Sequence, residues 1–276
     1  MSLSGATRLY AVLGSPVRHS LSPRLHNAAF AAHGIDAVYL ALEVSPDRAA
    51  RVPDALRTLG LAGANLTVPL KERVVAGLDE VVGVARVLGA VNTVVAHEGR
   101  LVGHNTDAAG FVAGVRQRRE VTGCRAVVLG AGGAGLACGA GLAEAGAAEV
   151  VFLNRTLARA EAAATRCRAA WPATAFAAGA LDDFADVVTR ADLVVQATSG
   201  GAADAVAALP VDHVRAGALW VDLGYWAPAP LHADVLSARG VDVQDGKPML
   251  VHQAALAFRH FTGISPDPAM LSRTIG

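Results

Sequence analysis

Charged side chains are scarce in this chain of 276 residues, and neither sign is in excess. Asp, Glu, Lys and Arg together make up 17% of the residues, and 24 acidic residues balance 24 basic ones. A chain without a basic excess has no electrostatic attraction for nucleic acid or for an anionic membrane surface. Hydrophobic residues make up 53% of the chain, which argues against disorder and allows a sizeable core.

Cysteine is also scarce, and no metal site is expected. Cys124, Cys138 and Cys167 are odd in number and lack metal-type spacing, and no histidine has a partner at ligand spacing. We expect the cysteines to be small buried residues of a reduced protein.

The N-terminal residues lack a basic start followed by a long apolar run, so we expect no signal peptide and a cytoplasmic location.

One long stretch has no charge at all. Ala126–Ala143 is 18 residues long, close to the length of a membrane span, but six of its residues are glycines. The glycines cluster after a four-residue apolar run. A tight turn between a strand and a helix explains this pattern better than a membrane span does.

Strand and helix patterns alternate along the chain, which predicts a largely parallel α/β architecture. In the first part, we expect strands at 9–14, 37–44 and 65–68, a hairpin around 97–100, and helices at 22–34, 46–60 and from 69. A helix is expected at 106–120, and the pattern then breaks at 122–125. A second series follows, with strands at 126–130, 149–154, 191–197, 219–224 and 241–245 and a final amphipathic helix at 248–263.

A glycine-rich loop opens this second series. Gly130, Gly132 and Gly135 have G-x-G-x-x-G spacing, directly after a strand and at the start of a helix. The first glycine allows a tight turn, the second lets the backbone approach a pyrophosphate, and the third permits close helix packing. A Gly-rich turn in an alanine-rich protein is the simpler alternative. Strand, spacing and helix agree on a dinucleotide loop made of Gly130, Ala131, Gly132, Gly133, Ala134 and Gly135.

The next strand ends in Asn154, Arg155 and Thr156, with Arg159 one helical turn later. A site for NAD would place Asp or Glu there to bind the ribose diol. Two guanidinium groups and a hydroxyl suit a ribose phosphate instead. A solvated basic helix start is the alternative, but cations at a helix N-terminus are unfavourable without an anion. The sequence therefore predicts NADP(H) as the cofactor.

Polar residues in the first part of the chain suggest a second site. Ser20 and Ser22 are two positions apart, so an extended segment would project both hydroxyls to one side, although Ser22 before Pro23 also suits a helix N-cap. Pro69 suits the first position of a helix, which puts Lys71 in the first turn, where the dipole disfavours cations.

Asparagines also stand near the ends of strand-like runs, where this residue type is depleted. They are Asn65, Asn92 and Asn105. A binding site is one interpretation, and local turn formation by the Asn side chains is the other.

Several motifs together resemble the shikimate dehydrogenase family. "GSPVRHSLSPRLHN" (Gly14–Asn27), "NLTVPLKE" (Asn65–Glu72), "GAVNTV" (Gly89–Val94) and "GHNTD" (Gly103–Asp107) are similar to its substrate domain. "GAGGAG", "NRT" and "DGKPMLVHQAALAF" (Asp245–Phe258) match in collinear order. Members reduce 3-dehydroshikimate to shikimate with NADPH.

The resemblance implies an α/β protein of two domains. An N-terminal α/β substrate domain would span 1–107, a C-terminal Rossmann domain would span 108–246, and a cleft would lie between them. A C-terminal helix of about 247–276 would pack back on the first domain. The protein would act on a small molecule, without nucleic acid or membrane, as a monomer or homodimer.

The resemblance also assigns roles to individual residues. The substrate would be bound by Ser20, Ser22, Thr67, Asn92, Gln253 and Tyr225, with the two serines on its carboxylate. Thr198 and Met249 would lie at the cofactor, and Asn65 and Asn105 would have supporting roles. Lys71 and Asp107 would form the catalytic pair, because the carbonyl oxygen gains negative charge on hydride transfer and needs a proton.

Two segments depart from the family pattern. Gln196, Ala197, Thr198 and Ser199 stand where the family has Asn-Ala-Thr-Ser, and the segment after Tyr225 has its first proline one place late. A dehydrogenase for quinate or aminoshikimate is therefore an alternative, although quinate-oxidising relatives often carry Thr in place of Ser22. A non-catalytic NADP-binding sensor is a third hypothesis, against which the presence of both Lys71 and Asp107 argues.

Overall fold

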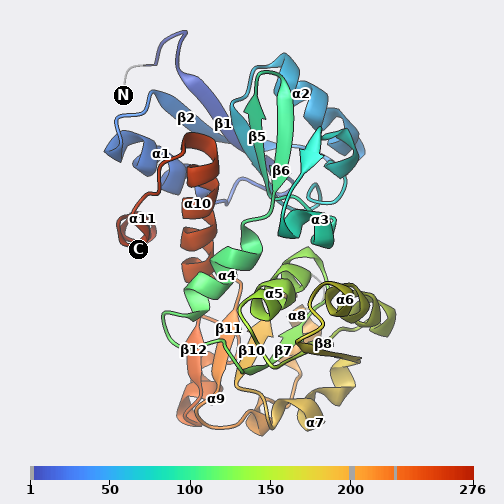
Figure 1. The fold of residues 1–276 in the computed structure, drawn as a ribbon. Coiled ribbons are helices and arrows are strands. Elements are labelled where there is room, and N and C mark those ends of the chain that lie inside the picture. The colour runs from blue at the N-terminus through green and yellow to red at the C-terminus, as the bar shows by residue number, and fades with distance from the viewer. Residues whose placement is uncertain (1–2, 199–202, 227–228) are drawn as a thin grey trace. The chain divides into compact units, whose positions relative to one another are not determined.

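Two six-stranded sheets organise the chain, one in each of two units (Figure 1). The computed structural model describes residues 3–198, 203–226 and 229–276. The first unit comprises Met1–Thr106 together with Leu250–Gly276, and the second comprises Asp107–Met249. The alternation of strands and helices confirms the α/β class.

The sheet of the first unit is mixed, with the order β2-β1-β3-β5-β6-β4. Its strands are β1 (Arg8–Gly14), β2 (Ala37–Glu43), β3 (Gly63–Leu66), β4 (Glu80–Val81), β5 (Thr93–His97) and β6 (Arg100–His104). β2 and β3 run parallel to β1, whereas β5 is antiparallel to both β3 and β6. The predicted hairpin is confirmed: Glu98 and Gly99 connect β5 to β6 with φ values of 50° and 78°, as a type I′ turn requires.

The helices of the first unit match the predictions only in part. They are α1 (Ser22–Ala32), η1 (Pro46–Arg51), α2 (Val52–Thr58), η2 (Val75–Gly77), α3 (Val84–Leu88), the larger part of α10 (Lys247–Thr262) and α11 (Pro268–Ile275). The prediction of one helix over 46–60 is wrong, because the segment divides between Arg51 and Val52. Pro53 lies in the first turn of α2, where its missing N–H costs no helical hydrogen bond.

The predicted helix from Pro69 is also wrong, because a series of turns replaces it. Leu70 N donates to Thr67 O at 2.8 Å and Arg73 N donates to Leu70 O at 3.0 Å. The carbonyl of Lys71 accepts the N–H of Val91 at 2.8 Å, so it does not take part in a helical ladder. Lys71 is therefore not in the first turn of an α-helix, and the dipole argument does not apply to it.

The C-terminal segment completes the core of the first unit. The rings of Phe261 and Tyr10 lie 4.9 Å apart, and Phe258 lies 5.2 Å from Phe30. Gly63 is required beneath this cluster, since a Cβ there would lie 2.7 Å from the Phe261 ring. The expected helix stop is confirmed by Gly263, with φ of +77°. A separate helix, α11, follows and lies beside α1 (Figure 1).

The sheet of the second unit is parallel throughout, in the order β12-β11-β10-β7-β8-β9. Its strands are β7 (Arg125–Leu129), β8 (Glu149–Leu153), β9 (Ala175–Gly179), β10 (Leu193–Gln196), β11 (Leu219–Asp222) and β12 (Asp242–Gln244). Counted along the chain, this is the order 3-2-1-4-5-6 of doubly wound dinucleotide-binding folds. β9 was not predicted, since it contains no β-branched residue.

Helices precede and connect the strands of this parallel sheet. They are α4 (Asp107–Val115), α5 (Gly133–Glu144), α6 (Leu157–Ala170), η3 (Leu181–Asp183), α7 (Phe184–Val188), α8 (Ala203–Ala207), η5 (Val211–His213) and α9 (Ala233–Ala238). The uncharged stretch Ala126–Ala143 forms most of β7, a loop and most of α5. In the described part of the chain, every helix is too short or too polar to cross a bilayer.

The three cysteines are buried thiols outside any disulfide, as predicted. Burial raises the pKa of both Cys124 and Cys167 to about 11. Thiols of this kind remain protonated at neutral pH and behave as apolar packing residues.

His26 is a polar residue buried in the core of the first unit. Its ring is 1% exposed and stacks on Tyr39 at 4.3 Å, and neither ring nitrogen has a hydrogen-bond partner. Burial lowers the pKa of His26 to about 3. The imidazole is therefore neutral in the folded protein at every pH above that value.

The burial of neutral His26 predicts that the folded protein loses stability in acid. The unfolded chain binds a proton at His26 below about pH 6.5, whereas the folded chain does not until about pH 3. The contribution of neutral His26 to the free energy of unfolding is thus fully present above pH 6.5. It declines as the pH falls, by about 2 kcal/mol between pH 7 and pH 5. Urea unfolding of His26→Leu should show a pH dependence weaker by this amount. Identical pH dependence in the wild type and the variant would contradict the assignment, and His97→Leu, on the exposed hairpin, is the matched control.

Candidate functional site

The glycine loop has the geometry of a phosphate-binding turn. Gly130 follows β7 with φ of +101°, a value that favours glycine. A Cβ on Gly135 would lie 1.9 Å from the carbonyl oxygen of Gly130. The helix α5 can therefore approach the end of β7 this closely only with glycine at position 135.

Gly132 and Gly133 are different, because the protein itself does not require glycine there. A Cβ on either residue would meet no protein atom within 4 Å, and Gly132 has an ordinary φ of −82°. Gly132 is the N-cap of α5, whose N–H groups receive no side-chain cap. Glycine at these positions keeps space open in front of the helix N-terminus, so the loop fits a bound pyrophosphate.

Asn154 connects this loop to the end of β8. Its Oδ1 accepts the N–H of Ala131 at 3.2 Å, and its Nδ2 donates to the carbonyl of Thr156 at 2.8 Å. Arg155, Thr156 and Arg159 are exposed around the start of α6, whose first turn has no acidic residue. This part of the predicted cofactor site is thus basic and accessible to solvent.

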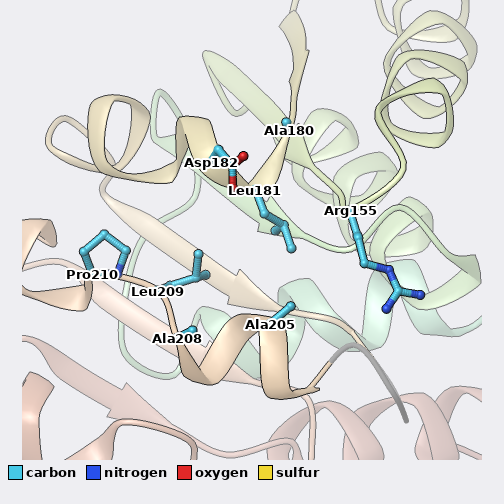
Figure 2. A pocket seen from close by; sticks show the side chains of 8 residues that line it. All are labelled: Arg155, Ala180, Leu181, Asp182, Ala205, Ala208, Leu209 and Pro210. Atoms are coloured by element: carbon cyan, nitrogen blue, oxygen red, sulfur yellow. The ribbon is translucent and has the colours of Figure 1, made fainter.

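A cavity of about 490 Å³ extends from Arg155 along the same edge of the sheet. Figure 2 shows the guanidinium of Arg155 at one end and Pro210 at the other. The remaining lining comes from η3 and α8 and their flanks, through Ala180, Leu181, Asp182, Ala205, Ala208 and Leu209. Of the lining residues, only Arg155 was predicted from the sequence, and β9, which leads into η3, was missed.

Tyr225 lies in a segment whose two ends are held by one carboxylate. Asp222 accepts the N–H groups of Gly224 and Leu231, each at 2.9 Å. The Tyr225 ring packs edge-on against Trp226 at 5.2 Å, and burial raises its pKa. Of the two segments that depart from the family pattern, Ser199, Ala227 and Pro228 lie outside the described part of the chain.

Met249 closes the second unit. It is half-buried, and its backbone N would lie 3.0 Å from a Cβ on Gly114. Glycine at position 114 thus lets α4 pass close to the first turn of α10.

In the first unit, strand directions bring the predicted substrate residues to one edge of the sheet. β3 is parallel to β1 and antiparallel to β5, so β1 and β3 end where β5 begins. Thr67 N donates to Leu13 O at 2.9 Å, and Leu66 N donates to Asn92 O at 2.8 Å. With Val91 bound to the carbonyl of Lys71, the structure places Thr67, Lys71 and Asn92 at this edge.

Ser20 and Ser22 are arranged differently from the prediction. The preceding chain is not extended but turns, since Ser20 N donates to Val17 O at 3.0 Å. Ser22 is not the N-cap of α1 either, because the N-cap is Leu21 and Ser22 is the first helical residue. The Oγ of Ser20 accepts the N–H of Ser22 at 3.3 Å, so it is Ser20 that satisfies an N–H at the helix start.

Asn92 is fully buried within a network of polar side chains. Its Oδ1 accepts the N–H of Thr106 at 2.8 Å and the hydroxyl of Thr93 at 2.9 Å, and its Nδ2 donates to the Thr106 hydroxyl at 2.9 Å. Asn65 extends the network by donating to Thr93 at 2.9 Å and accepting from Tyr39 at 2.7 Å. Turn formation alone therefore does not explain these asparagines.

Thr106 was missed at the sequence level, although it lies inside the motif that pointed to Asp107. Asp107 follows it directly, is 6% exposed and begins α4. Asn105 donates to Ala90 O at 3.1 Å, and Gln253 donates to Leu250 O within α10 at 3.0 Å. Within residues 3–198, 203–226 and 229–276, no three His, Cys, Asp or Glu side chains could together hold a metal ion.

The contrast between the loop glycines gives a prediction. Gly135→Ala forces the loop or the helix to shift, so the free energy of unfolding should fall by about 1–3 kcal/mol. Gly132→Ala meets no protein atom, so it should change stability by less than about 1 kcal/mol while weakening dinucleotide binding about tenfold or more. Urea unfolding and cofactor titration measure the two effects. A Gly132→Ala variant with undiminished cofactor affinity would contradict a pyrophosphate at this loop.

Family models match nearly the whole chain. Residues 12–94 match the shikimate dehydrogenase substrate binding domain, 114–245 match the shikimate / quinate 5-dehydrogenase domain, and 248–269 match the shikimate 5′-dehydrogenase C-terminal domain.

Individual relatives agree with these models over their full length. A shikimate dehydrogenase (NADP(+)) of Moorella thermoacetica is 41% identical over 100% of this chain and 95% of its own. The crystal structure of shikimate 5-dehydrogenase from Thermus thermophilus in complex with shikimate has a TM-score of 0.85 and 39% identity, covering 97% of each chain. Shikimate 5-dehydrogenase from Listeria monocytogenes, in complex with shikimate and NAD, has a TM-score of 0.91 and 28% identity, covering 100% of this chain and 99% of its own. By its fold, its collinear motifs and these matches, the chain belongs to the shikimate dehydrogenase family.

Proposed function

We propose that this protein is an enzyme that catalyses the reversible, NADP(H)-dependent reduction of 3-dehydroshikimate to shikimate. The observation that carries the proposal is the full-length match to relatives named shikimate dehydrogenase (NADP(+)). The chain also contains Lys71 and Asp107 at the motif positions of the proton-transfer pair. A dinucleotide-binding sensor without catalysis would not need that pair.

In the proposed mechanism, Lys71 serves the carbonyl that is reduced. Hydride transfer leaves negative charge on the carbonyl oxygen, and the ammonium group of Lys71 stabilises that charge and supplies the proton. Asp107 orients the ammonium and accepts a hydrogen bond from a substrate hydroxyl. The buried bonds between Asn92 and Thr106 support this role, because they fix the residue immediately before Asp107.

The remaining contacts follow from the chemistry of a small hydroxylated carboxylic acid. The hydroxyls of Ser20 and Ser22 donate to the carboxylate, and Thr67, Asn92, Gln253 and Tyr225 bind the ring hydroxyls. Asn92 already donates to Thr106 and accepts from two groups, so much of its hydrogen-bonding capacity is used within the protein, and these bonds hold its amide in place for the substrate.

For the cofactor, NADP(H) supplies the hydride when bound. The loop from Gly130 to Gly135 holds the pyrophosphate, and Arg155, Thr156 and Arg159 bind the ribose phosphate. The cavity beside Arg155 is lined mainly by Ala, Leu and Pro residues, which suit the adenine ring, together with Arg155 and Asp182. Asn154 orients the loop, while Thr198 and Met249 lie toward the nicotinamide half.

The proposal places the enzyme in the cytoplasm, in the route to chorismate and the aromatic amino acids, as a monomer or homodimer. The buried thiols of the three cysteines suit a reducing compartment. A quinate or aminoshikimate dehydrogenase is the second candidate. A quinate dehydrogenase of Corynebacterium glutamicum has a TM-score of 0.87 and 31% identity, and the segment after Tyr225 departs from the shikimate pattern.

A spectrophotometric assay with shikimate and quinate, each offered with NADP and NAD, tests these candidates. We expect shikimate oxidation with NADP, at a kcat/KM at least about tenfold above that with NAD, because charge-assisted hydrogen bonds from arginine favour the ribose phosphate. Quinate turnover exceeding that of shikimate would establish the second candidate. Turnover of neither acid would refute both.

The role of Lys71 is tested by Lys71→Met, which keeps an unbranched side chain only one atom shorter and removes the charge. We expect kcat to fall about 10²- to 10⁴-fold, as for the loss of a general acid, with the Kd for NADPH within about twofold of wild type. Thermal unfolding controls for the fold. A variant that keeps near-normal kcat would contradict the assigned role.

A further inference from the structure

Gln196 is a buried polar residue to which the proposed mechanism gives no role. It ends β10 and is 5% exposed. Its Oε1 accepts two hydrogen bonds from one residue, from Thr198 N and from Thr198 Oγ1, each at 2.8 Å. A backbone N–H can only donate, so the oxygen of the amide must face Thr198, and the orientation of the amide is fixed.

These two bonds determine what Thr198 can offer to a ligand. Both of its donors, the N–H and the hydroxyl hydrogen, point to Gln196. Only the lone pairs of Oγ1 remain, so the side chain acts as an acceptor. A phosphate oxygen is also an acceptor and is not a suitable partner, whereas an O–H or N–H group is.

Thr198 also lies against the phosphate loop. A Cβ on Gly130 would lie 2.9 Å from Thr198 Cγ2 and 3.1 Å from its backbone N. In the sheet, β7 lies between β10 and β8. The loop after β7 is thus contacted from one side by Thr198 and held from the other by the bond from Ala131 to Asn154.

From this geometry we infer that Gln196 is a positioning residue for the cofactor. It holds Thr198 against Gly130 and presents Oγ1 as an acceptor to a hydroxyl or N–H group of the dinucleotide, which a ribose and an amide both provide. The inference rests on the proposed function only in taking NADP(H) as the dinucleotide.

The chain offers a matched control for this idea. Gln244 is also 5% exposed, ends the parallel strand β12 of the same sheet, and makes one long hydrogen bond of 3.4 Å to Gly114 O. Gln196→Met and Gln244→Met remove the same amide from the last residue of two strands of one sheet. Gln196→Asn is the conservative variant, since an Asn side chain also accepts the N–H two residues later.

The experiment measures the Kd of each variant for NADPH by fluorescence titration, without substrate. We expect Gln196→Met to raise the Kd about tenfold, as the loss of one or two hydrogen bonds implies. The KM of Gln196→Met for shikimate should stay within about twofold of the wild-type value. The Kd of Gln196→Asn and that of Gln244→Met for NADPH should also stay within about twofold of wild type. Thr198→Val should weaken NADPH binding similarly, and the double variant Gln196→Met/Thr198→Val should be no weaker than either single one.

Wild-type affinity in Gln196→Met would overturn the inference. An equal loss in Gln244→Met would also overturn it, because the effect would then reflect general loss of a buried amide. If the wild type binds NADPH but does not oxidise shikimate, the proposed function fails, while the Kd values still decide the role of Gln196.

Discussion

The cofactor site depends on the close approach of α5 to the end of β7. This approach is possible because position 135 has no side chain, so that the helix can sit almost on the carbonyl of Gly130. The uncapped N–H groups of the helix then open at the carboxyl edge of a parallel sheet, where a pyrophosphate is stabilised by the helix dipole. Asn154 and Thr198 act on the loop from neighbouring strands.

The two units present polar groups in different ways. In the second unit, the loop offers mainly backbone N–H groups, and its side chains are small. In the first unit, the edge of the sheet carries side chains that are already hydrogen-bonded to one another, from Tyr39 through Asn65 and Thr93 to Asn92 and Thr106. Low exposure makes each of these bonds costly to break, so the groups at this edge are held in place before a ligand arrives.

Much of the fold follows from local patterns in the sequence. Continuous apolar runs identified the central strands, Gly99 and Gly263 marked a turn and a helix end, and the glycine spacing identified the start of α5. The errors arose where long-range contacts decided the outcome. The N–H of Val91 donates to the Lys71 carbonyl, and turns form where a helix was predicted. β9 pairs with β8 despite its weak strand propensity.

The site was predictable in its residue types but not in its bonding. Motif positions pointed to Asn92 and Asp107, yet the bonds between Asn92 and Thr106 join segments that are adjacent only in the folded sheet. Ser20 rather than Ser22 accepts an N–H at the start of α1, and this depends on a turn that no periodic pattern reveals. In the sequence, Gln196 is distinguished only by standing where the family has Asn. Its bonds to Thr198 are revealed only by the structure.

The order of segments along the chain has a consequence for biosynthesis. The second unit, Asp107–Met249, is continuous and interrupts the first. The core around Tyr10 and Phe30 needs Phe258 and Phe261, which a ribosome adds after the whole second unit has been made. The half of the protein that is synthesised first is therefore the half that finishes folding last, and its unfinished apolar surface is exposed throughout elongation of the other half.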